Sequence, residues 1–322
     1  CSSHVMFLPY SAFKYLDPVF RPYRMGRGET SPDMAARGHP QEGSKMDEST
    51  ENFAKMFANG KQDLGEMLEG YIYLRWPSLY IYHLRNIVAD PSIKLRHPDG
   101  VTPELDEMAR LVAERTLPTL MSAETSTYHG KVVRLDEARA LINVDHDINL
   151  TNLEKVIPYK HARDLILNNP GSIAVLPCPC RESKEKPCEP LEVCLWIGEP
   201  FVSFILEHKT KGARRISQDE ALDILKAEDD RGHVHTAWFK DAMGGRYYCM
   251  CNCCKCCCTA MRGHSMFGVP ILASSGYVAR ISEDCNACGE CVDFCQFGAI
   301  ALNGEARIIA EKCMGCGVCE SK

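Results

Sequence analysis

The sequence has no cysteine between Cys1 and Cys178, and the other eighteen of its nineteen cysteines lie between Cys178 and Cys319. A secreted protein held by disulfides is usually much shorter than 322 residues and distributes its cysteines among its loops. The uneven distribution therefore argues against that class. Closely spaced thiols indicate metal binding in a reducing compartment, which we expect to be anaerobic.

Other features are also missing. No run of about 20 apolar residues occurs, so we expect no membrane-spanning helix. There is no Gly-x-Gly-x-x-Gly motif, no phosphate-binding loop and no Cys-x-x-Cys-His haem motif, which leaves nucleotide cofactors and c-type haem without support. The net charge of −6 argues against a general nucleic-acid binder.

The densest thiol run is the segment 249–258, which reads CMCNCCKCCC and contains seven cysteines. Thiolates repel one another and free thiols oxidise, so such a run is unfavourable unless metal holds the sulfurs. Four further cysteines lie upstream, at Cys178, Cys180, Cys188 and Cys194. We expect the two groups to meet in space and to bind one or two clusters.

The last forty residues carry a second pattern, Cys285-x2-Cys288-x2-Cys291-x3-Cys295 followed by Cys313-x2-Cys316-x2-Cys319. This resembles a bacterial-type two-cluster [4Fe-4S] ferredoxin domain over about 283–322. In such domains the fourth cysteine of each run binds the other cluster. The resemblance implies one cluster on Cys313, Cys316, Cys319 and Cys295, and a second on Cys285, Cys288 and Cys291.

The tail departs from the ferredoxin pattern in two ways. The fourth ligand of the second cluster would stand at position 323, one residue past Lys322, and Gln296 stands where a proline is usual. We expect that the sequence is cut short there; a three-cysteine cluster and a missing cluster are the alternatives. At the other end, Cys1 suggests either a fragment, which we favour, or the lipidated first residue of a lipoprotein.

The middle of the chain carries a second resemblance. The order P-C-P-C-R, two further cysteines, a helix and C-N-C-C-x-C-C-C is similar to a group of ferredoxin-tailed iron–sulfur proteins of anaerobes, over about 143–322. That group implies no settled substrate. We expect the metal ligands of this part to come from Cys178, Cys180, Cys188, Cys194, Cys251, Cys253, Cys254, Cys256 and Cys257. Arg181 and Lys255 are placed to offset cluster charge.

Local patterns predict an α+β fold in four parts: an extended arm (1–50), a helical docking region (51–142), a cysteine-rich α/β domain (143–282) and the ferredoxin-like dicluster domain (283–322). Proline positions, N-caps and apolar periodicity predict the elements. The helices are expected at 49–58, 61–75, 77–88, 103–115, 136–142, 152–168, 200–208 and 218–227. The strands are expected at 171–176, 194–197, 234–239, 246–249 and 277–281.

Three functions remain open from the sequence. The first, which we favour, is an electron-transfer subunit with two [4Fe-4S] clusters in the tail and one or two in the cysteine-rich domain. It would serve a protein redox partner or a larger oxidoreductase complex in the cytoplasm, with association at the cytoplasmic membrane face as a variant. The second is a reductase whose cysteine-rich domain holds a substrate-binding cluster with an open iron site. The third is a zinc-bound structural or sensing module.

Overall fold

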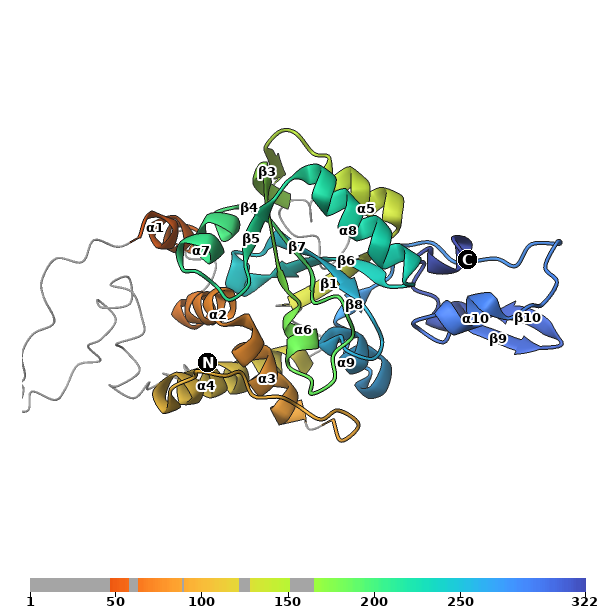
Figure 1. Ribbon diagram of the computed structural model, residues 1–322, viewed down its shortest axis with the longest axis horizontal. Helices are drawn as coiled ribbons and strands as arrows, with labels where there is room; N and C mark the ends of the chain where they lie inside the picture. The colour runs from red at the N-terminus through yellow and green to blue at the C-terminus, as the bar shows by residue number, and fades with distance from the viewer. Residues whose placement is uncertain (1–46, 58–62, 89, 122–127, 151–164) are drawn as a thin grey trace, which may run out of the picture.

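Helices and an eight-stranded sheet form the main body of the protein, and a small two-stranded unit follows it (Figure 1). The structure is a computed structural model that describes residues 47–57, 63–88, 90–121, 128–150 and 165–322. Helices together with a mixed sheet make it α+β, as the sequence predicts. The expected arm lies outside the described residues, apart from its last four positions.

The helices begin close to the residues that their capping signals predict. Asp63 accepts a hydrogen bond of 2.8 Å from the backbone N–H of Glu66, Pro77 is the first residue of its helix, and Ser217 accepts one of 3.1 Å from Glu220 N. The bounds are α1 Glu48–Lys55, α2 Leu64–Arg75, α3 Pro77–Val88, α4 Pro103–Met121, α5 Leu135–Ile142, α6 Pro179–Glu182, α7 Phe201–Glu207, α8 Gln218–Asp230, α9 Thr259–Phe267 and α10 Glu290–Phe294.

The large sheet has the order β2-β3-β4-β7-β6-β1-β8, with β5 paired to β3. Its pairs are antiparallel except for β1 with β8. The bounds are β1 Tyr128–Val133, β2 Ile148–Leu150, β3 Leu165–Pro177, β4 Glu192–Glu199, β5 Arg214–Ile216, β6 Val234–Lys240, β7 Arg246–Cys253 and β8 Leu272–Ala273. β9 (Ile300–Asn303) and β10 (Glu305–Ile308) form the separate hairpin.

The sheet separates two cores. On one face, Ile173, Leu195 and Met250 pack with residues of α5 and α8. On the other, Trp196 and Tyr248 pack with the aromatic residues of α2 and α3. Most of the aromatic side chains of 71–82 therefore form a packed core: Tyr71 and Tyr80 are almost fully buried, whereas Tyr82 is half-buried.

Two predicted elements are wrong where the structure can test them. Residues 165–168 belong to β3 rather than to a helix, and the remainder of that expected helix, up to residue 164, lies outside the described residues. Residues 277–281 form no strand. There, the Ala279 N–H donates to Cys313 Sγ at 3.5 Å, so this backbone N–H serves the ferredoxin sulfur rather than a sheet partner.

Candidate metal centres

The two cysteine groups of the middle region meet around the end of β7. This strand continues to Cys253, four residues further than predicted, and so carries the first half of the run 249–258. Cys194 comes from the neighbouring strand β4, and Cys178 and Cys180 come from the start of α6. The expectation that upstream and downstream cysteines share one place in the fold is thus met by this geometry.

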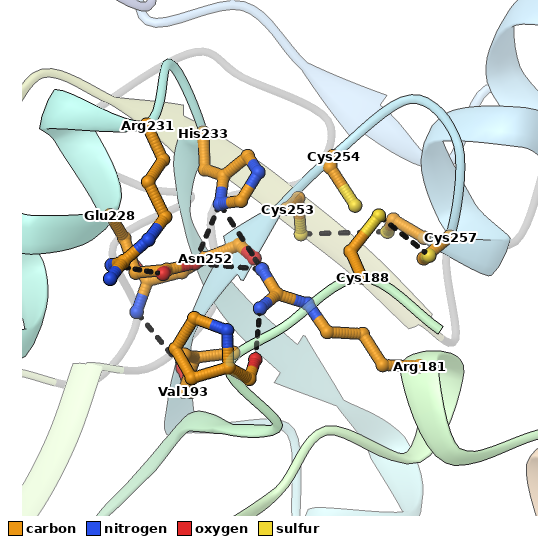
Figure 2. Close-up of polar contacts among 12 residues, drawn as sticks. Arg181, Cys188, Val193, Glu228, Arg231, His233, Asn252, Cys253, Cys254 and Cys257 are labelled. Carbon is orange, nitrogen blue, oxygen red and sulfur yellow. Dashed lines mark hydrogen bonds and ion pairs between the residues drawn. The ribbon is translucent and has the colours of Figure 1, made fainter. Parts of the chain in front are cut away.

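Four of these thiols form a compact set, which we call the four-thiol group: Cys188, Cys254, Cys256 and Cys257. All four sulfurs lie within 4.8 Å of one another, and the measured Sγ–Sγ distances run from 2.9 Å (Cys188–Cys256) to 3.8 Å (Cys256–Cys257). A turn at 255–257, closed by the Cys258 N–H donating to Cys254 O at 2.9 Å, brings the three downstream sulfurs together. The contact between Cys188 and Cys257 appears in Figure 2.

A second set, the three-thiol group, consists of Cys194, Cys249 and Cys251. Its sulfurs form a triangle with sides of 3.5, 3.7 and 3.6 Å. Hydrogen bonds from the thiols of Cys249 and Cys251 lower the pKa of Cys194 to about 5, so this sulfur is a thiolate at neutral pH. Cys249 is absent from the residues that the sequence selects as ligands.

Thiols from both groups, together with Cys178, Cys180, Cys253 and Cys258, surround a cavity of about 260 Å³ between the end of β7, α3 and α9. A single water needs roughly 10–15 Å³ of such space, so the cavity can hold a centre of several atoms. Its walls are mostly apolar, and its sulfurs come from Cys178, Cys180, Cys194, Cys251, Cys253, Cys254, Cys257 and Cys258. Thiolates, apolar walls and room for several atoms suit an iron–sulfur cluster.

Two thiols of the cavity are held at the start of α9. Cys180 Sγ accepts a hydrogen bond of 3.5 Å from the Thr259 N–H and lies 3.1 Å from its hydroxyl. Contacts with the thiols of Cys178 and Cys258 lower the pKa of Cys180, although burial opposes them. The Sγ atoms of Cys258 and Cys253 are 3.4 Å apart. Cys258 is not among the ligands that the sequence predicts.

Arg85 joins the two cysteine segments, and nothing in the sequence distinguishes it. Its guanidinium is buried and donates to the carbonyl oxygens of Cys180 and Cys257, at 2.7 Å each. Lys184 was also missed: its Nζ lies 3.7 Å from Cys257 Sγ and donates to Cys256 O at 3.2 Å. The side chain of Lys255, which the sequence favours for charge offset, is exposed.

Arg181 is buried and lines the same cavity. Figure 2 shows its polar contacts. Its guanidinium points toward Glu228 and His233, and it donates to Glu228 Oε2 at 2.7 Å and to Asn252 O at 3.2 Å. Its Nε is buried without a hydrogen-bond partner among the residues that the structure describes. A buried unpaired N–H on a cavity wall is costly, and an acceptor bound in the cavity would remove that cost.

The ferredoxin-like tail contains two loops of the same backbone form. In each Cys-x2-Cys-x2-Cys loop the residues on either side of the middle cysteine have positive φ: Ala287 (59°) and Gly289 (87°), then Gly315 (65°) and Gly317 (80°). A left-handed conformation is unfavourable for Ala287, by about 1–2 kcal/mol, so the loop is held by its surroundings. The repeated geometry indicates that both loops are built to wrap a cluster.

The sulfurs of the tail are spaced more widely than those of the four-thiol group. Among the described residues, no three tail cysteines lie within 4.8 Å of one another. Besides burial, the charges of Cys295 and Cys313 raise the pKa of both Cys316 and Cys319, which places these four sulfurs in one neighbourhood. Cys291 is similarly affected by Cys288 and Cys285, which are exposed.

Backbone N–H groups also point at these sulfurs, since the Ala299 N–H donates to Cys295 Sγ at 3.1 Å. Residues 278–301 match the family model of the 4Fe-4S binding domain. The C-terminal part of the chain is therefore a ferredoxin-type 4Fe-4S binding domain, and its first loop lies in the matched segment. Neither the curated proteins nor the solved structures contain a match to this chain.

The ferredoxin-type domain packs against the end of β7 through Gln296, the residue that replaces the usual proline. Gln296 Oε1 accepts from the Lys255 N–H at 2.9 Å, and its Nε2 donates to Gly232 O at 2.8 Å. Gly232 has a φ of 78° and lies against the ring of Phe294, where a Cβ would come within 2.4 Å of that ring. The departure from the ferredoxin pattern thus has a structural role.

Replacing Gln296 with alanine should loosen this contact. Two hydrogen bonds worth about 0.5–1.5 kcal/mol each are lost. We expect faster amide hydrogen exchange in 285–322 and little change in β3 and β4, measured by mass spectrometry. Asn303→Ala, an exposed substitution in the hairpin, is the matched control; equal exchange in the two variants would mean that Gln296 does not hold the domain.

None of the helices among the described residues is both long enough and apolar enough to cross a membrane.

Proposed function

We propose that this chain is an iron–sulfur electron-transfer subunit. Two [4Fe-4S] clusters would occupy the ferredoxin-type domain and one the thiol-lined cavity. The observation that carries the proposal is the hydrogen bond between Gln296 and the Lys255 N–H. It joins the ferredoxin-type domain to the turn at 255–257, which directly follows the cavity-lining end of β7. When bound, each cluster would gain and lose one electron at a potential set by its surroundings.

The residues around the cavity are suited to set that potential. Arg85 and Arg181 bring two buried cations close to the thiolates, and a buried cation favours the more negative, reduced state. Neighbouring thiols lower the pKa values of Cys180 and Cys194, which favours the thiolate form that binds iron. The apolar walls limit access of water.

At the other end, the thiols of Cys285 and Cys288 are exposed, and α10, β9 and β10 project from the main body in Figure 1. An exposed cluster site is where a protein partner could exchange electrons. We propose a redox partner, or a larger oxidoreductase complex of an anaerobic cell, at this end.

The test is chemical analysis combined with EPR of protein purified without oxygen. We expect about twelve iron and twelve sulfide per chain and reducible cluster signals after dithionite treatment. Cys285→Ser should remove signal and iron from the ferredoxin-type domain alone. Wild-type protein that contains iron but gives no reducible signal would contradict electron transfer.

The cavity also favours a second candidate, a reductase with an open iron site. The three-thiol group beside an apolar cavity is the arrangement that this alternative requires. An open iron site would bind an added ligand, so cyanide should change the EPR signal of the cavity cluster in a reductase. An unchanged signal would favour the electron-transfer subunit.

A further inference from the structure

The four-thiol group differs from every other cysteine set in the described residues because it is closed. Each of its four sulfurs lies within 4.8 Å of the other three, whereas the three-thiol group has no fourth sulfur at that range. The thiols of the ferredoxin-type domain do not form such a set at all. Among the described residues, close spacing and closure by a fourth sulfur therefore occur together only in the four-thiol group.

Spacing and closure together discriminate between a single ion and a cluster. The sulfurs of the three-thiol group are equally close, but only three are present, and Cys194 and Cys251 line the cavity. Four thiolates on one tetrahedral zinc ion, with Zn–S bonds of about 2.3 Å, lie about 3.8 Å apart. Four thiolates on a cubane bind four different iron atoms and must lie farther apart. The Sγ–Sγ distances of 2.9 Å for Cys188–Cys256, of 3.4 Å for Cys254–Cys256 and for Cys188–Cys257, and of 3.8 Å for Cys256–Cys257 are all at or below this single-ion spacing, so the group can surround one ion but not a cubane.

We propose that Cys188, Cys254, Cys256 and Cys257 bind a single structural zinc ion, separate from the iron–sulfur clusters. A closed set of four cysteines is a usual structural zinc site, although the Cys-x-Cys-Cys order is tighter than the common spacing. The turn at 255–257 explains how such neighbours converge. The inference does not depend on the proposed electron transfer, because it concerns a different metal.

The residues around the four-thiol group fit the negative charge of a zinc ion bound by four thiolates. Four thiolates and one zinc ion sum to −2, and the Lys184 ammonium lies 3.7 Å from Cys257 Sγ. The loop that carries Cys188 is fixed on its other side, where Arg96 N donates to Ser183 O at 2.9 Å and Glu185 N donates to Lys94 O at 3.1 Å. The zinc ion would clamp this loop to the turn whose Lys255 N–H contacts Gln296.

The first test is metal analysis of wild-type protein. We expect about one zinc per chain by mass spectrometry and, at the zinc absorption edge, four sulfur neighbours at about 2.3 Å. Cys256→Ser and Cys188→Ser should each lower zinc at least tenfold and leave iron and sulfide unchanged. Cys285→Ser should lower iron and leave zinc unchanged.

A second variant covers the case in which the serine variants do not fold. Lys184→Met keeps all four cysteine ligands but removes the ammonium group beside Cys257 Sγ. Loss of a group that contacts a metal ligand typically weakens metal binding by roughly 10–100-fold. We expect zinc to pass to a chelator at least tenfold faster than in Lys186→Met, an exposed control. Wild-type protein without zinc, or iron and sulfide lost in Cys256→Ser, would overturn the proposal.

Discussion

Replacing Cys194 with serine is expected to lower the iron content from about twelve to about eight atoms per chain, the loss of one [4Fe-4S] cluster. Cys194 is buried on β4, and it is the one member of the three-thiol group whose pKa is lowered. A serine hydroxyl stays protonated at neutral pH and is a poor iron ligand. The reducible signals of the ferredoxin-type domain should remain.

Two controls separate this effect from general damage to the fold. Met250→Leu changes the residue between Cys249 and Cys251, on the opposite face of β7, and a swap of similar volume costs under about 1.5 kcal/mol. It should keep all the iron. Cys188→Ser should keep the iron and lose zinc. If Cys194→Ser retains about twelve iron atoms, Cys194 is not a ligand of a cluster in the cavity.

The ferredoxin-type domain could be predicted because its ligands are local. The three cysteines of each Cys-x2-Cys-x2-Cys loop lie within seven residues of one another, so the motif is recognisable without knowledge of the fold, and the resemblance to ferredoxins implies that Cys295 belongs with the second loop. Helices α3 and α8 were predictable for the same reason, since Pro77 and Ser217 mark their starts within the segment itself.

The middle region was less predictable because its groups form across strands. Cys188 joins Cys254, Cys256 and Cys257 rather than Cys194, which depends on where the loop after α6 lies. Cys249 could have been found: residues 249, 251 and 253 alternate with period two, so a strand running through them places three sulfurs on one face. The local pattern alone predicts a strand that ends at Cys249, four residues before its actual end.

The cations were the least predictable part. Arg85 comes from a helix 95 residues before Cys180 and 172 residues before Cys257, and only the packing of α3 against α6 brings it to the carbonyl oxygens of both. Lys184 and Lys255 look equivalent in the sequence, yet the ammonium of Lys184 lies near a sulfur and the side chain of Lys255 is exposed. Side-chain direction of this kind is a tertiary property.

Replacing Arg181 with methionine is expected to destabilise the protein by about 3 kcal/mol, because the carboxylate of Glu228 would lose its buried cation and keep only the half-exposed Arg231, at 2.9 Å, and His233 as partners. Arg181 and Glu228 are 1% and 0% exposed, and their N–O distance is 2.7 Å. The same guanidinium donates to Asn252 O and to Pro190 O, so its removal also frees β7 and the loop before β4. The measurement is the urea concentration at which half of the holoprotein is unfolded, monitored by circular dichroism under oxygen-free conditions.

The double variant Arg181→Met with Glu228→Gln is the matched control. It removes the buried carboxylate that has lost its buried cation and should recover most of the lost stability, because a buried pair contributes less than the penalty of breaking it. Burial opposes ionisation of Glu228, but its hydrogen bond with His233 and its contact with Arg181 hold its pKa below the usual range. If Arg181→Met keeps its midpoint and instead lowers the potential of the cavity cluster, the main role of Arg181 is to offset cluster charge rather than to pair with Glu228.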